Sequence, residues 1–243
     1  MRIPNVYIEQ SLSLNESLTL SDEAFRHVSK VLRMRVGDRV KLFNGRGGWY
    51  LAEIESSSKK QTSVRIVEHC PGLTETKLEI TLVQGISRAQ HMDYTLQKSV
   101  EMGVTRIVPV QTDYGNVKLD QERRDNKRRH WQKIIIGACE QSGRDTLPEL
   151  LEPMALESWF EQEQNKHRFL LQPESGQSLS DVKPEDNKLS LIIGPEGGFS
   201  ESEIGFLLSK ECEAVSMGPR ILRTETAALA SITACQILWG DMA

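Results

Sequence analysis

The chain has 243 residues, a formal net charge of −4 at pH 7 and 38% hydrophobic residues. This length suffices for one large domain or two modest ones with a substantial core. No apolar run approaches a membrane span and MRIPNVYIEQ has no signal-peptide core, so we expect a soluble, cytoplasmic protein without membrane association. The four cysteines and five histidines are scattered without ligand spacing, which argues against a disulfide framework and against a metal site.

Short strand-like runs separated by glycine turns characterise the first part of the chain. The runs cover residues 39–43, 49–56 and 62–69, and a helix with apolar residues at helical spacing is expected over 21–32. This pattern predicts a small β-rich domain over residues 1–72, built as a barrel. Residues 1–77 hold 12 Lys and Arg against 9 Asp and Glu, a balance of +3 that permits RNA binding, with ordinary solvated charge as the alternative.

From residue 73 onward, strands and helices alternate. This order predicts a second domain over 73–243 with an α/β fold, in which helices cover both faces of a mostly parallel sheet. Capping-box spacings at Ser87/Gln90 and Ser200/Glu203 predict helix starts, and Gly103 and Gly143 predict helix ends. The expected strands are residues 78–85, 106–112, 167–172, 189–194 and 214–218, and the expected helices are 88–102, 120–142, 155–164, 201–210 and 225–239.

One of these helices begins with a strongly basic segment. Residues 118–133 contain seven Lys and Arg against three acidic residues, a balance of +4, whereas residues 149–213 carry a balance of −9. Contacts with RNA phosphates would give an affinity that falls steeply with salt, and a solvated helix face is the alternative. The candidate phosphate contacts are Arg123 and Arg124 here, and Arg2, Arg33, Arg35, Arg39 and Arg46 in the first domain.

A glycine-rich turn, GPEGG, follows the apolar run LSLIIG. Gly194, Gly197 and Gly198 can adopt backbone conformations that turn N–H groups toward a ligand. The turn lacks the Lys-Ser or Lys-Thr of a P-loop and the G-x-G-x-x-G spacing of dinucleotide folds, which removes most support for a kinase or a dehydrogenase. A tight turn without a ligand is the competing interpretation.

A second glycine turn, in SMGPRILRTET, follows the run at 214–218. It places Arg220, Arg223, Thr224, Glu225 and Thr226 together just before an alanine-rich helix. Thr224 or Thr226 could be the helix N-cap. Two arginines beside that cap suit an anion or an RNA phosphate, with solvated surface charge as the alternative. Because ligands of α/β sheets bind at the carboxyl ends of strands, the two turns predict one shared site.

Several motifs together resemble one known family. LIIGPEGGFS, SMGPRILRTETA, QKSVEMGV, ACEQSGR and the opening MRIPNVY resemble the RsmE family of the SPOUT superfamily, and the match covers the whole chain. The resemblance implies a PUA-like RNA-binding first domain and a methyltransferase domain whose C-terminal segment forms a trefoil knot. It implies transfer of a methyl group from S-adenosyl-L-methionine to N3 of uridine 1498 in 16S rRNA. It further implies a homodimer, and a domain-straddling RNA site makes the assembled small ribosomal subunit the expected substrate.

The resemblance also implies roles for individual residues. For this reaction our hypothesis is that Arg223 stabilises negative charge on the uracil carbonyls or binds an adjoining phosphate, and that Glu225 is the leading proton acceptor. Glu196 and Glu101 are further candidate carboxylates, and helix capping for Glu225 or bracing of its own turn for Glu196 is the alternative. Lys98, Arg144 and Arg220 are further candidate RNA contacts. Gln141 and Arg144 of the EQSGR motif would line the RNA entrance, and helix C-capping is the alternative for Arg144. The implied cofactor-binding residues are Leu170, Leu171, Gln172, Pro173, Gly194, Pro195, Glu196, Gly197, Gly198, Met217, Gly218, Leu222, Arg223, Thr224 and Thr226.

Two other functions remain compatible with the sequence. One is a ribosome-assembly or RNA-binding factor that keeps the fold without catalysis, which failure to bind S-adenosylmethionine would favour. The other is a related methyltransferase that acts on another RNA position, such as a ribose hydroxyl or a transfer RNA, which nucleoside analysis would reveal.

Overall fold

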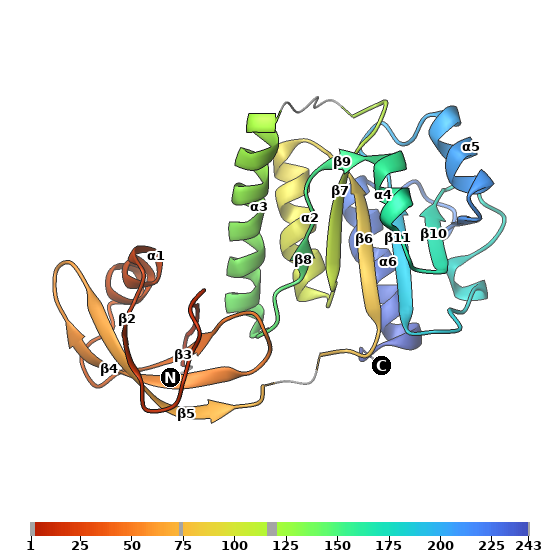
Figure 1. The fold of residues 1–243 in the computed structure, drawn as a ribbon. Helices are drawn as coiled ribbons and strands as arrows, with labels where there is room; N and C mark the ends of the chain where they lie inside the picture. The colour runs from red at the N-terminus through yellow and green to blue at the C-terminus, as the bar shows by residue number, and fades with distance from the viewer. Residues whose placement is uncertain (1–2, 73–74, 116–120, 243) are drawn as a thin grey trace. The chain divides into compact units, whose positions relative to one another are not determined.

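A computed structural model describes residues 3–72, 75–115 and 121–242 of the chain (Figure 1). Two compact units account for these residues. The first comprises Met1–Glu75 together with Ile136–Leu147, and the second comprises Thr76–Ile135 together with Pro148–Ala243. Arg2 and residue 120, which belong to the sequence predictions, lie outside the described residues.

The first unit is built on a five-stranded sheet with the order β1-β3-β4-β5-β2. The structure confirms the three predicted strands and adds two strands of three residues, which are too short to give a readable alternation. Over the described residues no ladder joins β1 to β2, so closure of the sheet into a barrel stays a prediction. The strands are β1 Asn5–Tyr7, β2 Ser17–Thr19, β3 Arg39–Phe43, β4 Trp49–Ser57 and β5 Thr62–Cys70.

Alternation along these strands builds the core of the first unit. Val40 and Leu42 of β3, Ile54 of β4 and Val64 of β5 point to the same side and are at most 1% exposed. The predicted helix at 21–32 is confirmed as α1 Asp22–Phe25, capped by Ser21, followed by a π-helical stretch Arg26–Val31. Its buried residues join this core, so burial of one face holds the short helix in place.

The second unit contains a parallel sheet with the order β12-β10-β11-β6-β7-β8, and β9 also pairs with β7. The predicted α/β class and parallel sheet are thereby confirmed. β6 and β11 are buried along almost their whole length, as expected of strands that are covered on both faces. The strands are β6 Glu79–Gly85, β7 Arg106–Gln111, β8 Glu149–Leu150, β9 Met154–Ala155, β10 His167–Leu171, β11 Lys188–Ile193 and β12 Glu213–Val215.

Helices cover this sheet. α6 packs against α2, β6 and β11, whereas α4 packs against β7 and β9. Figure 1 shows α4 in front of the strands and α6 behind them. Along the described residues no helix combines the length and apolar character needed to cross a bilayer. The helices are α2 Ala89–Glu101, α3 Gln121–Ser142, α4 Leu156–Gln162, α5 Glu201–Ser209 and α6 Thr224–Trp239, with a 3-10 turn at Leu179–Asp181.

The predicted helix boundaries have mixed outcomes. Ser200 and Glu203 form the expected capping box at the start of α5, and Gly103 and Gly143 have positive φ values of 87° and 88° at helix ends. The capping box predicted at Ser87 is wrong, because α2 begins after Arg88 without a side-chain cap. The backbone N–H of Arg88 instead donates 2.9 Å to Glu196 Oε1, a partner that no local pattern reveals.

Candidate active site

A cavity of about 940 Å³ lies where β10, β11 and β12 end. The chain segments that follow these three strands form most of its wall: 170–174, 193–199 and 215–225. β10 lies between β11 and β12 in the sheet, so its carboxyl end brings Leu170 and Leu171 between the two glycine turns. The tertiary structure thus brings both glycine turns onto one cavity.

Most residues assigned to a cofactor by sequence resemblance line this cavity. Thr226, an exposed residue in the first turn of α6, does not line it. The residues that do line it are Leu170, Leu171, Gln172, Pro173, Gly194, Pro195, Glu196, Gly197, Gly198, Met217, Gly218, Leu222, Arg223 and Thr224.

Close packing explains the glycines of the GPEGG turn. A Cβ on Gly194 would lie 3.0 Å from Gly198 Cα, and a Cβ on Gly85, at the end of β6, would collide with Pro195. Gly198 has a φ of 72°, and its N–H donates 2.9 Å to Pro195 O. The turn therefore folds tightly on itself and against β6, which leaves its outer side to the cavity.

Buried hydrogen bonds tie this turn to the start of α6. Thr224 Oγ1 donates 2.6 Å to Gly194 O and accepts 2.9 Å from Gln84 Nε2. Gln84 and Thr224 are 0% and 7% exposed. Thr224 is therefore a connector between strand, turn and helix, and neither it nor Thr226 is the N-cap, which is Arg223 without a side-chain cap bond.

Two of the carboxylates that line the cavity, Glu196 and Glu225, are candidates from the sequence, and their surroundings differ. Glu196 is exposed, and its Oε1 accepts the Arg88 N–H that opens α2. Glu225 is only 14% exposed, and its Oε1 lies 3.1 Å from His91 Nδ1. Glu225 Oε2 is buried, and no described residue gives it a hydrogen bond. The third candidate, Glu101, lies outside the cavity and pairs with Lys98 at 2.8 Å.

His91 is a cavity residue that the sequence predictions did not include. It follows the carboxyl end of β6, in the first turn of α2, and lines the cavity beside Glu225. The rule that ligands bind at the carboxyl ends of strands applies to β6 as well and could have singled it out. No recognisable motif surrounds His91 in the sequence. The rule by itself therefore did not distinguish His91 from the other residues that follow β6.

Two arginines bring positive charge to the mouth of the cavity. Arg220 and Arg223 are exposed and line it, and neither forms an ion pair with a described residue. Guanidinium groups of this kind can bind a carboxylate or a phosphate in a bidentate fashion.

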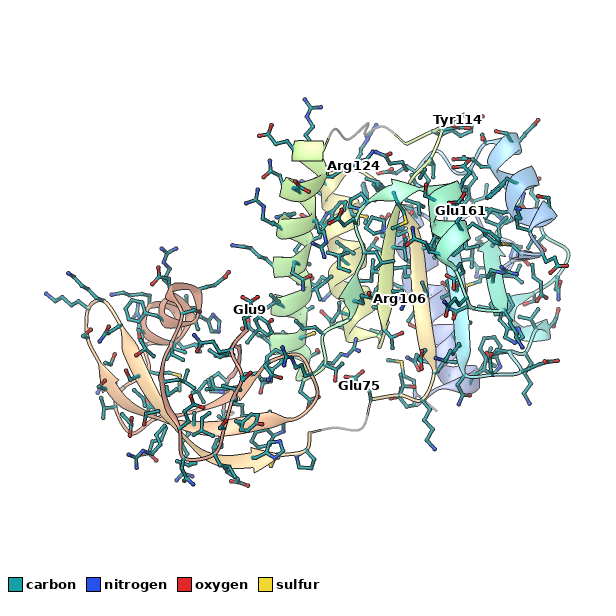
Figure 2. All side chains as sticks on the ribbon, viewed as in Figure 1. Glu9, Glu75, Arg106, Tyr114, Arg124 and Glu161 are labelled. Carbon is teal, nitrogen blue, oxygen red and sulfur yellow. The ribbon has the colours of Figure 1, made fainter. Side chains whose placement is uncertain are left out.

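The remaining candidate RNA contacts are distributed over both units. Arg33, Arg35, Arg39 and Arg46 are exposed in the first unit, and Arg123 is exposed on α3. Arg124, labelled in Figure 2, lies on α3 and donates 3.3 Å to Gln111 Oε1. Arg144 is 11% exposed and contacts Glu75, also labelled in Figure 2, through two hydrogen bonds of 2.6 and 3.2 Å. Arg144 thus forms an ion pair within the first unit, and Gln141 is exposed in the same unit.

The lining of the cavity suits S-adenosylmethionine. Its volume lies within the range of sites for cofactor-sized ligands. Leu170, Ile193, Val215 and Leu222 provide an aliphatic surface for a flat base, and the glycine turns bring main-chain groups to the ligand at close range. The acidic and basic side chains in the lining, Glu196, Glu225, Arg220 and Arg223, suit the charged amino-acid portion and a reacting group.

Comparison with known proteins places this architecture in a defined class. The RNA methyltransferase domain family matches residues 74–236, and the RNA methyltransferase PUA domain family matches residues 20–67. The fold and the matched regions define a PUA-containing RNA methyltransferase. A further comparison assigns the family within that class.

The chain is 36% identical to the ribosomal RNA small subunit methyltransferase E of Buchnera aphidicola subsp. Acyrthosiphon pisum, over 99% of this chain and 95% of the relative. It is 37% identical to the structure of that enzyme from Neisseria gonorrhoeae bound to S-adenosyl methionine, with full coverage of both chains and a TM-score of 0.95. A methyltransferase from Legionella pneumophila in complex with the same cofactor gives 39% identity, full coverage of both chains and a TM-score of 0.96. The chain belongs to the ribosomal RNA small subunit methyltransferase E (RsmE) family.

Proposed function

We propose that this protein transfers the methyl group of S-adenosyl-L-methionine to N3 of uridine 1498 in 16S rRNA of the small ribosomal subunit. The observation that carries the proposal is the single cavity on which the GPEGG turn, the RILRTET segment and the end of β10 meet. Family membership and two cofactor-bound relatives of the same fold support the reaction and the donor.

The cofactor is held mainly by backbone and aliphatic groups. The fourteen cavity residues named above form its site, and Thr226 supports that site from the first turn of α6. When bound, S-adenosylmethionine supplies a methyl carbon already activated by its sulfonium. The protein's task is then to position the acceptor in line with that carbon and to exclude water, because proximity and orientation supply much of the acceleration.

The acceptor nitrogen needs the greatest help from the protein. Uracil N3 carries a proton at neutral pH, so that proton must leave for the nitrogen to attack. Arg223 stabilises the negative charge that develops on the uracil carbonyls, and Arg220 holds a neighbouring phosphate. Proton removal takes place on the Glu225 side of the cavity, because Glu225 is the buried carboxylate with an unpartnered oxygen. Glu196 positions the first turn through its bond to Arg88.

The proposed domains are supported by the family matches to residues 20–67 and 74–236. Residues 1–72 form the PUA-like RNA-binding domain, a β-barrel, and residues 73–243 form the SPOUT methyltransferase domain. The C-terminal segment of that domain passes through the loop after β10 as a trefoil knot. Hydrogen bonds between this loop and the residue after β12 support the threading: Ser216 N donates 2.8 Å to Gln177 O, and Leu179 N donates 3.0 Å to Ser216 O.

The proposed partner is 16S rRNA within the assembled small subunit, in the cytoplasm. Arg2, Arg33, Arg35, Arg46, Lys98, Arg123, Arg124 and Arg144 are the proposed RNA-binding residues beside Arg220. Binding through several phosphates predicts an affinity that falls steeply with added salt. A homodimer is the proposed assembly, supported by exposed apolar side chains of α6 and the C-terminal residues, Ile237, Leu238 and Met242.

The test is methyl transfer from labelled S-adenosylmethionine to small ribosomal subunits that lack this modification. Digestion and nucleoside analysis are expected to place the label in 3-methyluridine. Label in another nucleoside would assign the enzyme to another RNA position. Absence of both label and cofactor binding would instead favour the non-catalytic assembly factor.

A further inference from the structure

His91 and Glu225 form a pair within the cavity. Their side chains meet at 3.1 Å between Nδ1 and Oε1. His91 lies in the first turn of α2 and Glu225 in the first turn of α6, two helices that pack against each other. The pair is 34% and 14% exposed and both residues line the cavity, so a ligand bound there can reach it.

We propose that His91, oriented by Glu225, is the catalytic residue that accepts the N3 proton of the target uracil. This inference rests on the proposed function, and refines the sequence prediction that Glu225 accepts the proton. Because Nδ1 lies 3.1 Å from the Glu225 carboxylate, the tautomer with its proton on Nδ1 is the favoured one, and its free lone pair is on Nε2, for which no hydrogen-bond partner occurs among the described residues. A carboxylate that fixes the tautomer of a histidine base is a recurring arrangement in enzymes.

The chemistry of the imidazole favours it over the neighbouring carboxylates. Histidine is the side chain whose charge changes between pH 5 and 8, which suits a base that works near neutral pH. One oxygen of Glu196 is already bonded to Arg88 N–H, and Glu196 is exposed. Glu225 is the buried partner whose negative charge stabilises the imidazolium. The charged residues that share the cavity with this pair are Glu174, Glu196, Arg220 and Arg223, so two further carboxylates offset the two arginines.

The proposed step balances as an in-line displacement. The N3–H bond breaks and its proton moves to His91 Nε2, while the N3 electron pair forms the new bond to the methyl carbon. The sulfur–methyl bond breaks, and its electron pair stays on sulfur as a neutral thioether. The imidazolium then returns its proton to water.

The first experiment compares His91→Gln with His130→Gln. His130 provides the matched control, because it also pairs with a carboxylate, Asp93, at 2.9 Å, and it lies outside the cavity. Single-turnover transfer to unmodified small subunits is measured at saturating cofactor, with cofactor affinity measured separately by calorimetry. We expect H91Q to lower the rate by about 10²–10⁴-fold with cofactor affinity within about threefold of wild type, and H130Q to leave both unchanged.

A second measurement concerns the imidazole itself and needs no turnover. Nitrogen-15 NMR of the histidine rings, with His91 assigned by H91Q, is expected to show the Nδ1–H tautomer in the wild type. Glu225→Gln should weaken that preference. A carboxylate can only accept a hydrogen bond from the imidazole, whereas an amide can also donate one to an unprotonated Nδ1.

The outcomes separate the two proposals. An H91Q rate within threefold of wild type, with 3-methyluridine still formed, would overturn the role of His91 and leave the proposed function intact. A wild-type Nε2–H tautomer would also overturn it, since Nε2 could not then accept a proton. If wild-type enzyme with bound cofactor forms no 3-methyluridine, the proposed function fails, and the inference fails with it.

Discussion

Thr224 Oγ1 donates a 2.6 Å hydrogen bond to the carbonyl oxygen of Gly194, and so joins the first residue of α6 to the turn that follows β11. Gln84, fully buried at the end of β6, donates to both groups, at 2.9 Å to the hydroxyl and 3.5 Å to the carbonyl. Gln84 is 140 positions from Thr224 and 110 positions from Gly194 in the sequence, and its bonds to both help to fix the shape of one cavity.

Replacing this hydroxyl tests its role in shaping the cavity. Thr224→Val keeps the side-chain volume but leaves Gln84 and Gly194 each without one partner. We expect a loss of about 1–3 kcal/mol in stability, because buried polar groups become unsatisfied, and cofactor affinity at least fivefold weaker by calorimetry.

Thr105→Val is the matched control for Thr224→Val. Thr105 Oγ1 also donates to a strand carbonyl, Ile80 O, at 3.0 Å, but it does not line the cavity. It should lower stability without altering cofactor affinity. Equal affinities for the two variants would contradict the role given to Thr224.

The contact between Gly85 and the GPEGG turn gives a second prediction. A Cβ at position 85 would come within 2.6 Å of Pro195 N, which is rigid backbone, so Gly85→Ala must displace the turn. We expect cofactor affinity to fall at least tenfold. Gly205→Ala on α5 is the control, because its Cβ meets no atom within 4 Å and alanine favours a helix by about 0.5–1 kcal/mol. Unchanged affinity for G85A would show that the turn tolerates displacement.

The Arg144–Glu75 pair gives a third prediction, which distinguishes a stabilising role of Arg144 from a direct contact of Arg144 with RNA. Arg144→Met leaves the partly buried carboxylate of Glu75 without its cation, so we expect about 1–3 kcal/mol of destabilisation. If Arg144 acts only through this pair, R144M combined with Glu75→Gln recovers both stability and RNA affinity. Weak RNA binding by a double variant of recovered stability, measured by filter binding, would instead support direct contact with RNA.

The fourth prediction concerns pH and Glu140, whose Oε1 accepts the Tyr7 N–H at 3.0 Å. Burial raises the pKa of Glu140 above its usual value of 4.5, although the Tyr7 N–H bond and His27 act in the opposite direction. A raised pKa means that the carboxyl stabilises the fold below the unfolded pKa, and that this stabilisation is lost as pH rises through the folded pKa.

Glu140→Gln removes this titration. The stability of E140Q relative to wild type should therefore increase from pH 4.5 toward neutral pH and then level off. Urea unfolding midpoints over that range measure the difference, with Glu16→Gln, at an exposed residue, as the control. A difference that shrinks with rising pH would show that the hydrogen bond from Tyr7 outweighs burial.

Local sequence determined most of the elements. Runs rich in apolar residues predicted β6 and β11, because a strand covered on both faces is mostly apolar. Ser200 and Glu203 predicted the start of α5, since a capping box satisfies helix N–H groups from within four residues. The two glycine motifs also identified most of the cavity lining, because each immediately follows a strand.

Only the tertiary structure decided which distant residues meet. The Arg88 N–H donates to the Glu196 carboxylate, Arg144 is paired with Glu75, and His91 lies beside Glu225. None of these partners is close in sequence, so no spacing rule could link them. The sequence supplied the chemical groups and the elements that carry them, whereas the order of strands in the sheet and the packing of α2 against α6 decided which groups share a cavity.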